Sequence, residues 1–161
     1  MTQRTELTGL LDRLAIDELI TGYARAVDDG DWPAYRALFT PDGRADYRSS
    51  GGIAGAAAEV SGWLEEKMRP FPVRQHLIVN RQVRIESPDG SAGDNAVLRA
   101  DYINPMRLDG PGAEQPGGPD FHTGGRYTFT LQRTDDGWRV REIVAQEKWR
   151  RTPTEGHSQP G

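Results

Sequence analysis

The spacing of apolar residues changes half-way along this chain from about every 3.6 positions to every second position, and this change most constrains its fold. In the first half, one apolar stripe marks a long helix that should end near Asp29-Gly30, where glycine takes the left-handed conformation readily. The stripe consists of Leu7, Leu10, Leu11, Leu14, Ile16, Ile20, Tyr23 and Val27. We expect it to face the interior.

Two shorter helices with a strand between them are predicted next. Asp31 is a favourable N-cap for the first of these helices, which the run Pro41-Asp42-Gly43 should end. A strand is expected over residues 44–48 and the second short helix over residues 54–68. The first short helix is expected to carry Tyr35, Leu38 and Phe39 on its apolar face.

The second half of the chain alternates like strands. The predicted strands cover residues 76–86, 95–108, 121–133 and 138–150, and residues 134–137 (TDDG) give a strong hairpin signal. Helices followed by mostly antiparallel strands indicate an α+β fold. A curved sheet wrapped around helices leaves a pocket between the two layers, which is where ligands usually bind.

Length and composition fit one ordinary domain. The 161 residues are expected to form a single domain over 1–151 and a polar, disordered tail over 152–161. The Gly/Pro-rich segment 109–120 is either a mobile lid over the pocket or an ordinary exposed loop.

Charge and cysteine content exclude several classes of function. The net charge of −4 argues against a nucleic-acid partner, and the absence of cysteine excludes disulfides and thiol nucleophiles. No segment has the length and apolarity of a membrane span, and residues 1–20 lack the features of a signal peptide, so a cytoplasmic protein is expected.

Few residues offer chemistry. His76 opens an apolar strand and is the best candidate for moving protons near neutral pH, although a lone histidine is more often structural. Asp28 lies near the C-terminal end of the first helix, which is unfavourable for a carboxylate. It is either solvated there, the simpler interpretation, or paired with a histidine in the pocket. Tyr23 should reach the pocket from the inward stripe, and Tyr47 lies on a polar strand.

Known cofactor motifs are missing from the sequence. The Gly-rich segments match neither a phosphate loop nor a dinucleotide fingerprint, and no G-x-S-x-G or H-E-x-x-H motif occurs. We therefore expect neither a cofactor nor a dedicated metal site.

The run IDELITGYARAVDDGDWPAYRALFTPDGRADYRS (residues 16–49) resembles the start of SnoaL-like proteins of the NTF2-like superfamily. The segments RQHLIVN and GGRYTFTLQRTDDGWRVREI, together with Trp149, extend the resemblance over about residues 10–151. It implies a cone of N-terminal helices packed on a curved sheet that encloses a pocket. The same fold hosts enzymes, binding subunits and transport factors.

Within this superfamily the chain is most similar to scytalone dehydratase-like and bile-acid dehydratase-like proteins. The Tyr-Asp pair of scytalone dehydratase reads Val27-Asp28 here, so the acid is kept. Its D-Y-R-S tyrosine corresponds to Tyr47 and its Q-H histidine to His76, whereas its second histidine falls near Asn104. The oxyanion-binding tyrosine of ketosteroid isomerase aligns with Tyr23 and its catalytic aspartate with Tyr47, which makes that carboxylate route unsuitable.

The resemblance implies a cofactor-independent lyase or isomerase of dehydratase type. His76 would act as general acid/base, Asp28 would orient it, and Tyr47 and Tyr23 would hold an oxygen of the substrate by hydrogen bonds. The substrate would be a cyclic or aromatic small molecule, for example polyketide- or terpenoid-like. The residues expected to bind it are Trp63, Phe71, Ile78, Tyr102, Asn104, Met106 and Phe129.

Two alternatives remain open. The first is an epoxide-opening cyclase or hydrolase in which Asp28 and His76 take the two catalytic roles. The second is a non-catalytic ligand-binding or assembly subunit, as in the β subunits of ring-hydroxylating dioxygenases. Because relatives associate through the sheet, a homodimer or homotrimer is expected.

Overall fold

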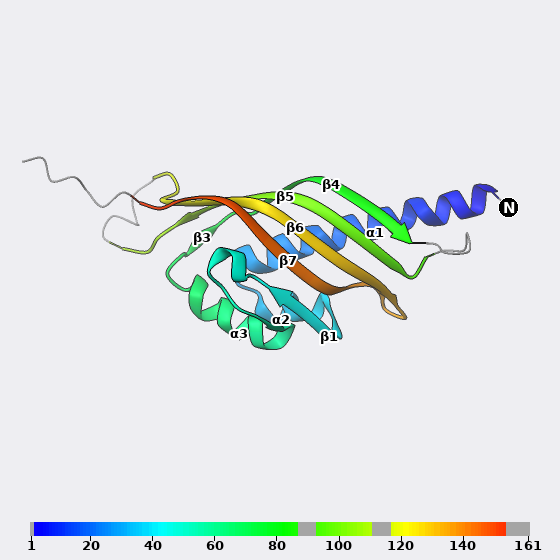
Figure 1. Cartoon of the computed structure of the whole chain (residues 1–161), viewed down its shortest axis with the longest axis horizontal. Helices are drawn as coiled ribbons and strands as arrows, with labels where there is room; N and C mark the ends of the chain where they lie inside the picture. The colour runs from blue at the N-terminus through cyan, green and yellow to red at the C-terminus, as the bar shows by residue number, and fades with distance from the viewer. Residues whose placement is uncertain (1, 87–92, 111–116, 154–161) are drawn as a thin grey trace, which may run out of the picture.

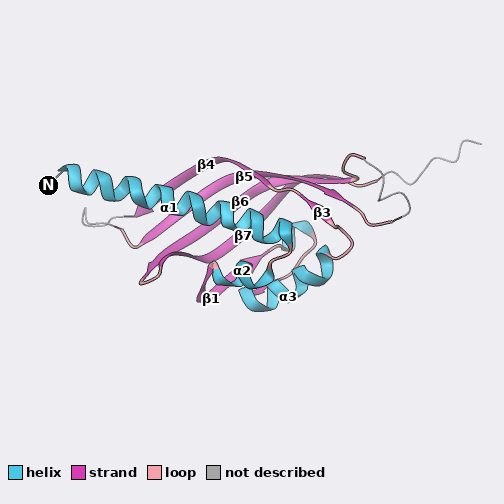
Figure 2. Cartoon of the chain, turned by 180° about the vertical axis from the view of Figure 1, so that it is seen from behind, coloured by secondary structure: helices cyan, strands magenta, loops and turns pink. Residues whose placement is uncertain are grey.

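A strongly curled sheet forms one layer of the molecule, and helices lie against its inner face (Figures 1 and 2). The computed structural model describes residues 2–86, 93–110 and 117–153. The helices are α1 (Thr2–Asp29), α2 (Trp32–Ala37) and α3 (Ala57–Met68). The strands are β1 (Phe39–Asp46), β2 (Ala54–Ala56), β3 (Val73–Arg74), β4 (Leu77–Glu86), β5 (Asn95–Arg107), β6 (Phe121–Thr134) and β7 (Gly137–Arg151). This arrangement confirms the predicted α+β cone.

The sheet is mixed. Its strand order is β2-β1-β7-β6-β5-β3, and β4 also pairs with β5. The strand β1 runs parallel to β7, and the other pairs are antiparallel. The long strands β5, β6 and β7 carry a buried residue at nearly every second position, so one side of each forms the inner face that receives α1.

Local turn chemistry follows the sequence closely. Gly30 adopts a positive φ of 67° directly after α1, and the carboxylate of Asp31 accepts the backbone N–H of Ala34 at 2.9 Å as the N-cap of α2. Thr134 pairs with Gly137 at the predicted hairpin between β6 and β7. These three predictions are confirmed, and the hairpin places β7 in the middle of the sheet.

The apolar stripe of α1 is only half inside. Its C-terminal part is buried, with Ile16 and Ile20 fully covered. Its N-terminal part is exposed, against our expectation: 55–57% of the surface of Leu7, Leu10, Leu11 and Leu14 is accessible. Figure 1 shows the reason, because the first turns of α1 run out beyond the edge of the strands.

Two boundaries in the helical half also differ from the prediction. The second helix ends at Ala37, and Phe39 already belongs to β1, which includes Pro41 at an irregularity in the register. Residues 54–56 form β2 instead of the first turn of a helix. In both places pairing with neighbouring strands overrides the local turn and helix signals.

Some expectations lie outside the described residues. Half of the segment 109–120, expected to be a lid or a loop, falls in the undescribed residues 111–116. Most of the predicted tail falls in residues 154–161, and part of the turn after β4 falls in residues 87–92. In the described helices, no stretch combines the length and apolarity needed to cross a membrane.

Candidate functional site

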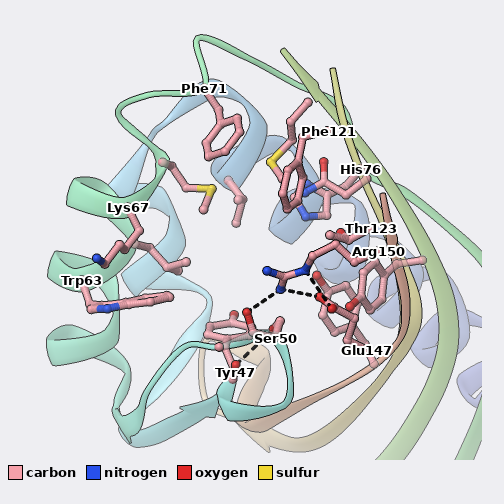
Figure 3. A pocket seen from close by; sticks show the side chains of 18 of the residues that line it. Tyr47, Ser50, Trp63, Lys67, Phe71, His76, Phe121, Thr123, Glu147 and Arg150 are labelled. Carbon is pink, nitrogen blue, oxygen red and sulfur yellow. Dashed lines mark hydrogen bonds and ion pairs between the residues drawn. The ribbon is translucent and has the colours of Figure 1, made fainter. Parts of the chain in front are cut away.

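A cavity of about 350 Å³ opens between α1, α3 and the inner face of the sheet (Figure 3). The helix α1 contributes Tyr23 and Val27, and α3 contributes Trp63 and Lys67 from the opposite wall. The lining is mainly apolar and aromatic, with a few polar groups. This size and character are typical of small-molecule sites.

His76 and Asp28 form a tight pair at this cavity. The Nδ1 atom of His76 lies 2.5 Å from Oδ1 of Asp28, and the backbone N–H of His76 donates to Oδ2 at 2.8 Å. Because a carboxylate can only accept, Nδ1 carries a proton, and in the neutral imidazole Nε2 is then the nitrogen with the lone pair. The sequence alone favoured a solvated Asp28, and that interpretation is wrong. The carboxylate is engaged through both oxygens, and 18% of its side chain is accessible.

Arg74 holds the two halves of this pair together, and the sequence analysis missed it. Its guanidinium donates to the backbone carbonyls of Val27 and Asp28 at the end of α1, both at 3.0 Å. It also donates to the carbonyl of Met68, the last residue of α3, and to that of Phe71 beyond the helix. Arg74 therefore satisfies carbonyls that the end of α1 leaves without intrahelical partners, two residues before His76. Burial lowers the pKa of Arg74.

Four tyrosines gather beside the pair. The hydroxyl of Tyr47 lies 2.9 Å from that of Tyr23 and 3.1 Å from that of Tyr35, and the ring of Tyr127 packs edge-on against Tyr23. Tyr23, Tyr47 and Tyr127 line the cavity. Tyr47 directly follows β1 at the start of a 3₁₀ turn (Arg48–Ser50), where the sequence analysis had placed it on the strand.

Burial keeps this cluster neutral. It raises the pKa values of Tyr23, Tyr47 and Tyr127 well above their usual range, and the neighbouring hydroxyls add to the effect. The pKa of Tyr35 is raised for the same main reason. All four hydroxyls are therefore protonated at neutral pH, and those of Tyr23, Tyr47 and Tyr127 belong to residues that line the cavity.

The structure brings five of the seven expected substrate-binding residues into the lining and leaves two out. The five are Trp63, Phe71, Tyr102, Asn104 and Met106. Ile78 and Phe129 do not belong to it, which corrects the expectation. Both are on the inner face, but they lie in the closed hydrophobic core, where Phe129 packs against Tyr23 and Tyr127.

The far side of the cavity carries charged residues that the sequence analysis did not select. The guanidinium of Arg150 binds both carboxylate oxygens of Glu147 at 2.9 Å and donates to the carbonyl of Ser50 at 2.7 Å. It also lies 5.4 Å from the ring centre of Phe121. Figure 3 shows this group projecting between His76 and Tyr47. Residues on β7 reach the cavity only because of the curl of the sheet, which no local pattern reveals.

No group of three or more potential metal ligands occurs within residues 2–86, 93–110 and 117–153. The polar side chains that line the cavity are an imidazole, phenol hydroxyls, an amide, Ser and Thr hydroxyls, and the charged groups of Lys67, Glu147 and Arg150. Such a set is suited to moving protons and holding oxygen atoms.

A family model described as a SnoaL-like domain matches residues 8–144. This chain belongs to the SnoaL-like family. Uncharacterised proteins from Mycobacterium tuberculosis and Mycobacterium bovis are 34% identical to it over 129 residues, which is 80% of this chain and 80% of theirs.

Solved structures share the SnoaL-like fold. The Kfla4162 protein of Kribbella flavida superposes with a TM-score of 0.74 at 23% identity, covering 88% of this chain and 94% of that one. A scytalone dehydratase candidate from Novosphingobium aromaticivorans gives 0.72 at 18% identity, covering 98% and 100%. The hexachlorocyclohexane dehydrochlorinase LinA-type3 of Novosphingobium barchaimii gives 0.72 at 16% identity, covering 97% and 99%. At these identities the likeness concerns the fold alone.

Proposed function

We propose that this protein is a cofactor-independent lyase or isomerase of dehydratase type that acts on a cyclic or aromatic small molecule. The observation that carries the proposal is the His76–Asp28 pair, with Nδ1 fixed by the carboxylate and Nε2 left as a base at an aromatic cavity. Two neighbours of the same fold are named for eliminations, a dehydrochlorinase and a scytalone dehydratase candidate.

The reaction begins with proton removal. Nε2 of His76 takes a proton from a carbon next to a carbonyl, and the electrons of that C–H bond form the C=C bond of an enolate. Asp28 holds the ring in the required tautomer and stabilises the imidazolium that results. Tyr23 or Tyr47 donates to the oxygen on which negative charge develops.

The second step decides the outcome. In a dehydration, the imidazolium returns its proton to a hydroxyl on the neighbouring carbon, the C–O bond breaks and water leaves. In an isomerisation, the same proton returns to another carbon. Each well-placed acid/base group is expected to contribute about 10²–10⁴-fold to the rate, and an oxyanion donor roughly 10²–10³-fold.

The geometry disfavours the epoxide-opening alternative. That reaction needs a free acid beside the substrate, whereas both oxygens of Asp28 are engaged by His76 and Asp28 does not belong to the cavity lining.

One observation favours the assembly-subunit alternative. Leu77, Ile103 and Trp149 are 44–46% exposed, and the register places them in one row on the outer face of the sheet, where Gly124 separates Ile103 from Trp149. Such an apolar row suits a protein partner. The proposed enzyme needs His76 for turnover, whereas an assembly subunit does not.

The test is turnover of cyclic β-hydroxyketones and polycyclic hydroxy compounds, followed by mass spectrometry. We expect a product that has lost one water or an isomer of unchanged mass. His76→Ala and Asp28→Asn should each lower kcat by about 10²–10⁴-fold while the melting curve stays cooperative. Asp29→Asn, a matched change at the exposed neighbouring carboxylate, should leave kcat unchanged.

If the two variants turn over substrate as the wild type does, the catalytic pair is refuted. Ligand binding that persists in both variants, without turnover in any form of the protein, would favour the assembly-subunit function.

A further inference from the structure

Buried polar side chains on the sheet point to a recognition subsite next to His76. Five polar residues are buried in the described part of the chain: Asp12, Thr40, Ser61, Asn104 and Thr123. The first three have partners within the fold, since Asp12 binds Arg133, Thr40 donates to Asp42 and Ser61 accepts from Arg36. Asn104 and Thr123 lie side by side in the cavity lining.

Among these five buried polar residues, Asn104 differs in that its amide oxygen has no partner in the part of the chain that the structure describes. Only 6% of its surface is accessible, and within the described ranges its amide oxygen Oδ1 has no hydrogen-bond partner. Burying an amide oxygen without a partner is unfavourable. Because rotation about Cβ–Cγ exchanges Oδ1 and Nδ2, the amide can present either an acceptor or a donor to the cavity. A ligand hydroxyl would satisfy it.

Strand register places this amide directly beside the base. The pairs Arg74↔Met106 and Leu77↔Ile103 share one register, which puts His76 opposite Asn104. Asn104 is in turn opposite Thr123, and Thr123 is opposite Arg150. Directly opposite residues have Cβ atoms about 4.5–5.5 Å apart. His76, Asn104, Thr123 and Arg150 therefore form a polar row across the cavity floor, part of which is visible in Figure 3.

Arg150 closes this row, and two of its three guanidinium nitrogens already have partners within the fold. Its Nε and Nη2 atoms bind Glu147 and the carbonyl of Ser50. The amide of Asn104 and the hydroxyl of Thr123 are therefore the members of the row best placed to bind a ligand close to His76.

The neighbouring rows are apolar and aromatic. Met106 pairs with Phe121 on one side of the polar row. On the other side Tyr102 pairs with Gly125 and stacks on Tyr127 with ring centres 4.1 Å apart. Gly125 is required there, because a Cβ would lie 2.9 Å from the Tyr102 ring and 2.2 Å from the carbonyl oxygen of Gln146. A ring compound can thus lie on the aromatic rows with one polar substituent over the polar row.

We propose that Asn104 and Thr123 form a hydroxyl-binding subsite, and that the substrate is a ring compound with a hydroxyl group near the carbon that loses its proton to His76. The substrate hydroxyl donates to Oδ1 of Asn104 and accepts from the hydroxyl of Thr123. This subsite rests on the proposed function, and it narrows the substrate class to hydroxylated rings.

The test compares affinities, so it does not depend on turnover. The probes are 1-tetralones that carry either a hydroxyl or a methyl group at ring carbon 2, 3 or 4, with dissociation constants measured by calorimetry. For at least one position we expect the wild type to bind the hydroxyl compound about tenfold more tightly, the value of one neutral hydrogen bond. Asn104→Leu and Thr123→Val should each reduce that preference several-fold.

Matched variants separate recognition from structural effects. Thr128→Val, on β6 like Thr123, and Asn95→Leu, at the start of β5, should keep the preference for the hydroxyl compound. Asn104→Leu should keep a wild-type melting temperature, because the amide oxygen it removes has no partner among the described residues. His76→Ala should retain the hydroxyl preference while losing turnover.

Two results would overturn the subsite. One is the absence of any hydroxyl preference in the wild type, including failure of every probe to bind. The other is a preference that persists in Asn104→Leu and Thr123→Val. A preference that disappears in these variants, in a protein that turns over none of the probes, would refute the proposed chemistry on such rings and leave the subsite intact.

Discussion

At the scale of single residues, the hydroxyls of Tyr23, Tyr35 and Tyr47 determine how negative charge on a substrate oxygen can be stabilised. Tyr47 is the centre of this cluster, because its hydroxyl bonds to both Tyr23 and Tyr35. Only Tyr23 and Tyr47 of these three face the cavity. Each hydroxyl that donates to the next makes that neighbour a better donor, so the cluster should act as a unit.

Removal of single hydroxyls should therefore have graded effects. We expect Tyr47→Phe and Tyr23→Phe to lower kcat by about 10²–10³-fold, the usual effect of losing an oxyanion donor. Tyr35→Phe is the matched control, because its hydroxyl lies behind Tyr47, and it should lower kcat only several-fold. Steady-state kinetics of the three variants measures the loss of kcat in each. Equal losses in all three would mean that the cluster is structural.

At the scale of secondary-structure elements, polar contacts attach the first half of α1 to the sheet. The carboxylate of Asp12 binds the guanidinium of Arg133 through two bonds of 2.8 and 2.7 Å and accepts from the indole N–H of Trp138 at 3.1 Å. Asp12 is buried, whereas the leucines around it are exposed. This cluster therefore fixes α1 to the β6–β7 hairpin.

Asp12→Asn should destabilise the protein by on the order of 3 kcal/mol, because it leaves Arg133 without its main partner. For a chain of this size the melting temperature should fall by roughly 6–12 °C. Asp17→Asn, which breaks the more exposed ion pair with Arg81, should change it little. Thermal denaturation followed by circular dichroism measures both.

The same contact predicts a pH dependence. The hydrogen bonds from Arg133 lower the pKa of Asp12 below its ordinary value of 3.8. A carboxylate with a lowered folded-state pKa stabilises the protein above the unfolded-state value, and this stabilisation is lost as the pH falls through 3.8 toward the folded-state pKa. The difference in melting temperature between the wild type and Asp12→Asn should be largest near pH 7 and shrink below pH 3.8. A difference that stays constant down to the acid transition would contradict this account.

At the scale of the whole molecule, the outer face of the sheet bears an apolar row of Leu77, Ile103 and Trp149 opposite the cavity side. We propose that this row is covered by a second copy of the chain in a homodimer or homotrimer. Exposed apolar area of this kind is typical of protein contacts.

Ile103→Asp should lower the molar mass measured by light scattering after size exclusion, because it introduces a charge into that contact. Thr130→Asp, elsewhere on the sheet, is the control and should not change the mass. A wild-type protein that elutes as a monomer at all concentrations would contradict the proposal.

The sequence by itself determined the helices, the long strands and their order, but not the short strands β2 and β3. Helical spacing, the N-cap at Asp31, the glycine at 30 and the hairpin at 134–137 act over a few residues, and for this reason their consequences were predictable. His76, Asp28 and the two tyrosines were candidates from the sequence, and the resemblance gave them a joint catalytic role.

Only the tertiary structure decided which residues meet. The pairing of His76 with Asp28 joins positions 48 residues apart, and the polar row crosses strands that are adjacent only after the sheet has formed. The curl of the sheet brings Arg150 to the cavity, and the position of α1 leaves four leucines exposed and places Ile78 and Phe129 in the core. A local pattern fixes which side of an element is apolar, but what covers that side depends on long-range packing.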